Sequence, residues 1–488
     1  MRTPRRLIGT FIAIVGLIAV IPASAQALSL SGLSAAPTST QAGAHSDVHI
    51  HMNFSGGQVK NLTVGLPPGL VGNPNAAPLC TVDQLNTDAC PANTKVGAVT
   101  ANATVTVAVV PVTLDVHGDL YNLTPQPGEP ARFGIVLRPI RGDLCALLPP
   151  ELCALVPNIL PPVTLQSAVQ LRPDFGLNTV ISDIPNTTSG LDTTINSQDI
   201  TLFGTAPGTG KPFMRNPTSC GTNTTSFTAV PYTGSTATGT ASFTTTNCGG
   251  LDFSPSFSAR VGGPGQTGGG SSRVPTTVIT SIDQDVDEAG LVKAQVAVPS
   301  NDLVANANLL GSTCPPADFQ AGTCPGSSVV GSAIAASPLL SLPLAGNVML
   351  VSNGGPVPDV GLDLNGQLHL LLKGNLTLSE VVTFDGLPDI PIAHFQLTFT
   401  PNPGLLTANR DLCAPPAPLF HADFTGYNGA TTSVDSPATV DGCGAGNSGG
   451  VGSKCKKAKK KHRHHRAAES KKHKKRSCKK KRRKKSHR

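Results

Sequence analysis

The sequence predicts an all-β protein of two tandem, disulfide-stapled, β-sandwich-like repeats followed by a disordered basic tail. Short runs of Val, Leu and Thr alternate with polar residues between turns, in a chain rich in Gly (51) and Pro (43). A cysteine-containing string occurs twice with the same spacing, and the last 35 residues are almost entirely basic. Alternation gives each strand one apolar and one polar face, which is what two packed sheets require.

The first 25 residues have the features of a secretory signal peptide. Arg2, Arg5 and Arg6 precede an apolar run from residue 7 to 21, and small residues end the segment at Ala25. This run is short for a bilayer span, so cleavage is favoured over the alternative of an uncleaved membrane anchor. We therefore expect an exported protein with an N-terminal leader at residues 26–45.

The body is predicted to be a duplication. The string C-x9-C-P-x4-V-G begins at Cys80 and again at Cys314, 234 residues later. Agreement in so many spacings indicates two copies of one domain. We place β-rich repeat 1 at residues 46–261, a Gly-rich linker at 262–273 and β-rich repeat 2 at 274–443.

Ten of the twelve cysteines are expected to form local disulfides, as is usual for exported proteins. Closing loops of about ten residues would stabilise each repeat by roughly 3 kcal/mol. The spacing does not fit a thiolate zinc site, which favours two to four intervening residues. Pairing consecutive cysteines is the economical choice, although sequence alone does not prove connectivity. The candidates are Cys80 with Cys90, Cys145 with Cys153, Cys220 with Cys248, Cys314 with Cys324, and Cys413 with Cys443.

Charge is strongly segregated along the chain. Residues 454–488 contain 21 Lys and Arg against one Glu, a net charge of +20, whereas residues 26–453 carry −15. Such a tail repels itself and has no apolar surface to bury, so it is expected to be disordered behind a Gly/Ser-rich tether at 444–453. Its densest basic runs are Lys456, Lys457, Lys459, Lys460 and Lys461, then Lys479, Lys480, Lys481, Arg482, Arg483, Lys484 and Lys485. The pairing of Cys455 and Cys478 within it stays open.

The tail is predicted to bind anionic cell-wall polymers or a membrane surface, because charge density alone supports such tethering. Nucleic acid is a weaker alternative, since export separates the chain from it and the tail has no aromatic residue to stack on bases. A tail that folds back on the acidic body, or is merely solvated, is the other alternative.

Two clusters of potential ligand residues are candidate metal sites. His45, Asp47, His49 and His51 share one strand face, but the apolar row opposite indicates that this is the solvent face. Asp283, Asp285 and Asp287 resemble the start of a calcium loop. The loop lacks the glycine at its sixth position and the acidic residue at its twelfth, so an irregular Ca²⁺ site competes with an acidic turn. No other cofactor is expected.

No catalytic motif is evident. Residues 206–211 resemble a phosphate-binding loop but lack its first glycine and a following helix, and neither a G-x-S-x-G nucleophile elbow between a strand and a helix nor an H-E-x-x-H string is evident. Trp is absent and Tyr numbers three, which disfavours a sugar-stacking platform. An enzyme is therefore not predicted, although a triad assembled across the fold stays open.

The stretch LPPGLVGNP from Leu66, the repeated cysteine string and the Cys/Lys-rich end resemble secreted repeat proteins of high-GC Gram-positive, actinobacterial type. This resemblance implies an exported surface protein with no assigned activity and no catalytic residues. We expect a non-enzymatic cell-surface or envelope protein, structural or ligand-binding, held to the wall by its tail. The alternatives are a secreted hydrolase retained at the wall and a calcium-dependent adhesin module.

Overall fold

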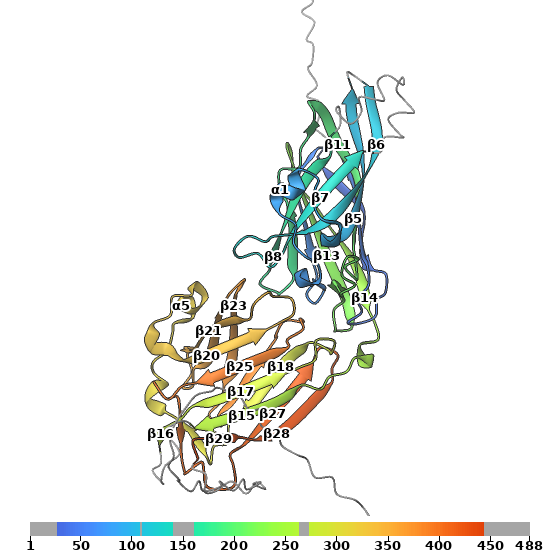
Figure 1. The fold of residues 1–488 in the computed structure, drawn as a ribbon. Helices are drawn as coiled ribbons and strands as arrows, with labels where there is room; N and C mark the ends of the chain where they lie inside the picture. Colours follow the sequence, from blue (N-terminus) through green and yellow to red (C-terminus); the bar gives the residue numbers. More distant parts are fainter. Residues whose placement is uncertain (1–26, 108–109, 140–160, 263–272, 444–488) are drawn as a thin grey trace, which may run out of the picture. The chain divides into compact units, whose positions relative to one another are not determined.

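A computed structural model describes residues 27–107, 110–139, 161–262 and 273–443 (Figure 1). These residues are mostly β-strand. The predicted signal peptide, the Cys145–Cys153 pair, most of the Gly-rich linker and the basic tail lie outside the described residues. Among the helices that are described, none is long and apolar enough to cross a membrane.

The first sheet has twelve strands and is antiparallel throughout, in the order β1-β2-β11-β5-β6-β7-β8-β9-β3-β13-β14, with β10 paired to β11. Its end strands β1 and β14 lie against each other, so the sheet closes into a flattened barrel with two facing walls. The strands are β1 (Ser29–Pro37), β2 (Val48–Ser55), β3 (Val59–Leu66), β5 (Lys95–Val107), β6 (Val110–Leu123), β7 (Arg132–Pro139), β8 (Val163–Leu171), β9 (Leu177–Ile181), β10 (Thr187–Thr188), β11 (Leu191–Leu202), β13 (Gly221–Pro231) and β14 (Ala237–Thr245).

The second sheet also has twelve strands, in the order β28-β27-β18-β24-β23-β22-β21-β20-β25-β17-β15-β29. Here β15 lies beside β28 and closes a second flattened barrel. The strands are β15 (Ser256–Gly262), β17 (Val278–Asp283), β18 (Leu291–Ala297), β20 (Val329–Ala336), β21 (Leu344–Val351), β22 (Asp359–Asn365), β23 (His369–Leu376), β24 (Val381–Asp385), β25 (His394–Phe399), β27 (Leu419–Gly426), β28 (Thr431–Pro437) and β29 (Thr439–Asp441).

The two sheets have the same topology. The two strand orders agree when each strand of the first sheet is matched to one of the second. The matches are β1, β2 and β3 with β15, β17 and β18, then β5–β9 with β20–β24, and finally β11, β13 and β14 with β25, β27 and β28. Each fold copy has its own buried hydrophobic core. The predicted all-β, duplicated architecture is confirmed. From here, repeat 1 denotes the barrel of β1–β14 and repeat 2 that of β15–β29.

The edges of the two barrels differ from the predicted boundaries. Strand β1 lies within the predicted leader at residues 26–45, yet it is a full member of the first sheet. Strand β15 lies at the end of the predicted repeat 1 (residues 46–261), yet it pairs with β17 and β29 of the second sheet. Strand pairing is a long-range property, so matching the repeated sequence strings could not assign these edge strands.

Short elements complete each copy. There are two small sheets. In the first, β4 (Val71–Gly72) pairs with β12 (Met214–Arg215). In the second, β26 (Leu406–Ala408) lies between β16 (Val274–Pro275) and β19 (Leu303–Ala305). The helices are α1 (Val82–Asn86) and α5 (Pro316–Ala321), with single 3₁₀ turns η1 (Pro74–Ala76), η2 (Ala92–Thr94), η3 (Cys248–Gly250), η4 (Ala307–Leu309) and η5 (Gly326–Ser328).

Four of the predicted cysteine pairs form disulfides: Cys80–Cys90, Cys220–Cys248, Cys314–Cys324 and Cys413–Cys443. The first and third staple α1 and α5 at equivalent places, each over a small buried cluster. In both copies a glycine allows the helix to approach the sheet. A Cβ on Gly134 would lie 2.6 Å from Leu85 of α1, and a Cβ on Gly361 would lie 2.7 Å from Phe319 of α5.

Candidate functional site

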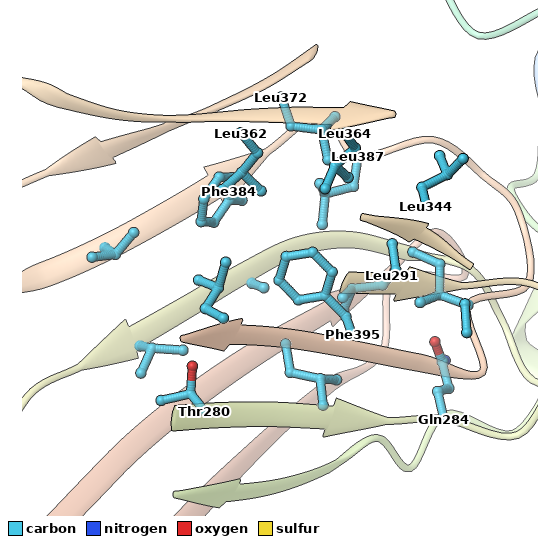
Figure 2. A pocket seen from close by; sticks show the side chains of 18 of the residues that line it. Thr280, Gln284, Leu291, Leu344, Leu362, Leu364, Leu372, Phe384, Leu387 and Phe395 are labelled. Atoms are coloured by element: carbon cyan, nitrogen blue, oxygen red, sulfur yellow. The ribbon is translucent and has the colours of Figure 1, made fainter. Parts of the chain in front are cut away.

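The second barrel encloses a cavity of about 100 Å³ (Figure 2). Side chains from both facing walls of the barrel line it, and they belong to β15, β17, β18, β20–β25 and β27. Of its 29 wall residues only Thr280, Gln284 and Ser337 have polar side chains, and no charged residue is among them. A concave, apolar site with a few polar groups is the usual form of a small-molecule pocket.

The cavity follows the length of strand β17. Because side chains alternate across a strand, Val278, Thr280 and Ile282 all face the interior, and Gln284 continues the row just beyond the strand. Figure 2 shows Thr280 and Gln284 on one side of the space and Leu362, Leu364 and Leu372 on the other. Six residue steps along a strand span about 20 Å, so the wall residues come from the whole length of β17.

Several apolar side chains that point into this barrel are only half-buried. They belong to the core by position and packing, but the cavity leaves part of their surface accessible. These residues are Val296, Val298, Ala335, Leu370, Leu372, Val382 and Phe395. Protein cores are normally packed to the density of organic crystals, so an inward row with exposed surface marks an interior that its own side chains do not fill.

The equivalent positions of repeat 1 are filled. Strand pairing places Ile50 and Met52 of β2 opposite β11 in the same way that Thr280 and Ile282 lie opposite β25. Counting two residues further along each chain aligns Phe54 with Gln284. Ile50, Met52 and Phe54 are 4%, 0% and 7% exposed. Repeat 2 therefore has Thr where repeat 1 has Ile, and Gln where repeat 1 has Phe.

The registers give exchanges in both directions elsewhere in the barrel. Leu62 of β3 lies between β9 and β13, and the equivalent position of β18, between β24 and β27, is Ala294. In the same register the neighbours Ile181 and Ala229 are replaced by the larger Phe384 and Phe424. The cavity therefore reflects how the whole set of side chains packs, and not a uniform loss of volume.

The polar groups of the cavity differ in their bonding. The Gln284 amide nitrogen donates to the Ala289 carbonyl at 2.7 Å, and the Ser337 hydroxyl accepts from the Leu339 amide at 3.3 Å. Within the described residues the Thr280 hydroxyl has no hydrogen-bond partner. It is therefore a polar group that faces the cavity and is available to a ligand.

Aromatic rings line the middle of the cavity, and loops line one end. Phe257 pairs with Ile282 across the strands, and the centroids of Phe257 and Phe420 lie 6.4 Å apart. At the Gln284 end, the wall is formed by the loop that follows β17 and by residues 387–392. The loop end is therefore the candidate entrance.

The entrance loops are held by a buried polar cluster. Asp389 accepts hydrogen bonds from the Thr218 amide at 2.7 Å and the Thr218 hydroxyl at 2.5 Å, and the Gly290 amide donates to that hydroxyl at 2.9 Å. Arg215 donates to the Glu288 carbonyl. Burial raises the pKa of the Asp389 carboxyl, an effect that the bonds from Thr218 and the charge of Arg215 oppose.

A second cavity of about 110 Å³ adjoins the entrance. It shares six wall residues with the first: Ser337, Leu340, Leu344, Leu370, Pro388 and Ile390. Its remaining wall includes Leu66, Phe133 and Leu202 of repeat 1. The entrance therefore leads to further apolar space.

The predicted acidic loop is not assembled as a metal site. Asp283 pairs with the His394 ring at 2.6 Å, Asp285 accepts from the Asp287 amide at 3.1 Å, and Asp287 lies 3.7 Å from the His45 ring. Over the described ranges, no group of three or more His, Cys, Asp or Glu side chains could hold a metal ion. The three carboxylates thus act separately, each in a local contact.

The histidine row lies where the sequence pattern indicated. Val48, Ile50 and Met52 are buried, while His49 and His51 lie on the solvent face of β2. The His49 ring bonds to Thr201 at 3.0 Å and the His51 ring to Asp199 at 2.7 Å, both across the strand pair with β11. These are cross-strand surface contacts and bring no ligand set together.

Sequence reasoning missed Thr280 and Gln284. The signal was present, because once Val48–Phe54 is aligned with Val278–Gln284, polar residues replace Ile and Phe on the core-facing row. The basic residues of the tail, Cys145 and Cys153 lie outside the described residues, so their predicted roles stay predictions.

No protein-family model and no curated protein matches the sequence. Among solved structures, the chain is similar to a Corynebacterium diphtheriae protein provisionally named as membrane-anchored, with 8% identity over 84% of this chain and 94% of that one and a TM-score of 0.19. It is also similar to the type II cohesin dyad of the ScaA scaffoldin from Acetivibrio cellulolyticus, with 8% identity over 84% and 97% of the two chains and a TM-score of 0.16. At these values the likenesses carry no conclusion about function. The first of these proteins is actinobacterial, and the predicted family resemblance stays a prediction.

Proposed function

We propose that this protein is an extracellular, non-enzymatic binding protein whose second barrel holds an apolar ligand. The observation that carries the proposal is the apolar cavity of repeat 2, which borders Thr280 and Ile282, whereas their equivalents in repeat 1, Ile50 and Met52, are buried. An apolar cavity of this order takes up apolar guests, because its wall offers water few hydrogen-bond partners.

An extracellular location is consistent with several features. Four disulfides close loops within the described residues, and such bonds persist in oxidising compartments. The signal-peptide pattern of residues 1–25 supports export to such a compartment. A binding function outside the cell is compatible with an exported, disulfide-bonded protein.

The basic tail, residues 454–488, is proposed to tether the protein to anionic wall polymers or to a membrane surface. Its charge of +20 is opposite to the −15 of the body, so the surface-binding and ligand-binding parts are separate in the sequence. A pull-down on isolated cell walls, with and without residues 454–488 and over a salt series, tests this. Tail-dependent binding that weakens steeply with salt is expected, and equal binding of both forms would contradict tethering by the tail.

A hydrolase in this cavity would need a nucleophile with a base, or a pair of acids that activates water. The cavity wall carries one Thr, one Gln and one Ser, with no acid, His or Lys among its residues. Binding is therefore the function that the geometry of this site favours.

A small apolar probe tests the binding proposal directly. Benzene added to the mature chain is expected to shift the methyl NMR signals of repeat 2 residues such as Leu362 and Leu372, and to leave those of Met52 unchanged. The double variant T280I/Q284F, which restores the residues of repeat 1, should abolish the shift because it fills the cavity. The control S281I places an added apolar side chain on the outer face of β17 and should keep the shift. Absence of any shift in the wild-type protein would overturn the proposal.

A further inference from the structure

We infer that the repeat 2 cavity takes a small, uncharged alcohol of about four to six non-hydrogen atoms, whose hydroxyl bonds to Thr280. This inference rests on the proposed binding function and adds the size and the chemical class of the ligand. Three observations carry it: the volume of the cavity, the absence of charge from its wall and the unpartnered hydroxyl of Thr280.

The volume sets the size of the ligand. An apolar cavity of about 150 Å³ takes up one benzene molecule, which has six carbon atoms. The repeat 2 cavity has a volume of about 100 Å³, so by proportion it holds about four non-hydrogen atoms, with a molecule of the size of benzene at the upper limit. Short-chain alcohols fall within this range, whereas fatty acids, sterols and fused rings exceed it.

The wall excludes charge. Its only polar side chains are those of Thr280, Gln284 and Ser337, and none of them is ionised. An ammonium or carboxylate group brought into the cavity would lose its hydration without gaining a partner of opposite charge. The polar group of the ligand is therefore uncharged.

Thr280 supplies a hydrogen bond inside the cavity. In the sheet it lies between Ala259 of β15 and Leu397 of β25, and neither side chain can bond to a hydroxyl. Thr280 is half-buried, and its hydroxyl makes no hydrogen bond among the described residues. Figure 2 shows its oxygen directed into the interior of the barrel. A hydroxyl on the ligand can both donate a hydrogen bond to this oxygen and accept one from it.

Repeat 1 shows that the fold does not require a hydroxyl at this position. The equivalent residue, Ile50, lies between Ala35 and Ile200, so it also has an alanine on one side and a large aliphatic residue on the other. Ile50 is 4% exposed and fills its place. A hydroxyl in such an apolar setting costs stability unless it is bonded. A hydrogen bond to a ligand would give Thr280 the partner that the fold does not supply.

A series of compounds of equal size tests the inference. Pentane, 1-butanol and butylammonium have the same number of non-hydrogen atoms and differ in their terminal group, and 1-decanol adds a control for size. Each is titrated into the full mature chain, and binding is followed by the methyl NMR signals of Leu362 and Leu372. We expect pentane and butanol to shift these signals. Butylammonium should bind at least about tenfold more weakly than butanol, and decanol should not shift the signals.

The variant T280V tests the hydrogen bond, because it replaces the hydroxyl by a methyl group and keeps the shape of the side chain. T280V should weaken butanol at least about fivefold, since the hydroxyl of the ligand is left without a partner, and should not weaken pentane. T383V is the matched control. It makes the same change on the outer face of β24, where the neighbours Val382 and Phe384 face the cavity, and should alter neither affinity.

The outcomes separate this inference from the proposed function. If benzene shifts repeat 2 signals but butanol does not, or if butylammonium or decanol binds as well as butanol, the chemical class is wrong and the cavity function stands. If T280V changes butanol and pentane alike, or changes neither, the role of Thr280 is wrong. If neither benzene nor any compound of the series binds, both proposals fail together.

Discussion

Repeat 1 and repeat 2 share a strand order, a disulfide-stapled helix and a glycine that admits that helix to the sheet, yet their interiors differ. In repeat 1 the core-facing row of β2 consists of Val48, Ile50, Met52 and Phe54, all buried. In repeat 2 the same row includes Thr280 and Gln284 and borders a cavity. Repeat 1 has an apolar cavity of about 70 Å³ at a different place, lined by residues such as Ala103, Leu114 and Ile195. The comparison shows that the outer scaffold of this fold tolerates a change of core composition, so the two copies place their cavities differently.

The hollow interior has a cost. An unfilled volume of about 100 Å³ destabilises a core by about 2 kcal/mol. A ligand that occupies the space restores the missing contacts and stabilises the folded form by mass action. Substitutions that change the volume of either interior should therefore remove this difference in packing between the repeats or make it larger.

The largest effect is expected from hollowing repeat 1. Met52 is fully buried, so M52A should destabilise repeat 1 by about 2–5 kcal/mol. I282A, its equivalent in repeat 2, should have a smaller effect because Ile282 already borders empty space. Hydrogen exchange of the amides in β2 and β17 measures the two repeats separately. An equal loss in both repeats would contradict the view that Ile282 borders a cavity and Met52 does not.

The disulfide staples should instead behave alike. Removing Cys80–Cys90 or Cys314–Cys324 by double Ser substitution should destabilise its own repeat by roughly 3 kcal/mol, because the two loops have the same length. Chemical denaturation with hydrogen exchange as the readout gives each value. A large difference between the two variants would show that the copies do not use the staple in the same way.

Filling the cavity should convert repeat 2 toward repeat 1. T280I/Q284F should raise the stability of repeat 2 by about 1–2 kcal/mol, part of the cavity cost, and should remove benzene binding. The melting temperature of repeat 2 with and without benzene checks both parts. A variant that is less stable than wild type and still binds would mean that the two side chains do not reach the cavity.

The smallest effect concerns the cluster at the cavity entrance. Burial raises the pKa of Asp389, so its protonated form is favoured in the folded protein. The stability that this group contributes is present at low pH and is lost as pH rises through the raised pKa. D389N carries no charge at any pH, so its melting temperature relative to wild type should increase with pH over that range. Parallel pH profiles of the two proteins would show that the carboxyl is not perturbed by its burial.

Much of the fold could be predicted from short-range patterns. Alternation in Val48–Phe54 indicated which face of that strand is buried, and the ten-residue cysteine spacing indicated the staples. The assignment of β1 and β15 could not be predicted in this way, because the partners of an edge strand are distant in sequence. The acidic run at Asp283–Asp287 was visible as a motif, but only the folded chain shows that its carboxylates have separate partners.

The sequence by itself indicated the β class, the duplication and the four cysteine pairs that the structure describes, since alternation and repeated spacing can be seen along the chain. Only the tertiary structure decided that Thr280 faces Leu362 and Leu372 across an unfilled space. The physical reason is that a cavity depends on the summed volumes of side chains from strands far apart in the chain. The position of Thr280 at a cavity can be recognised only once the residues that pack against it are known.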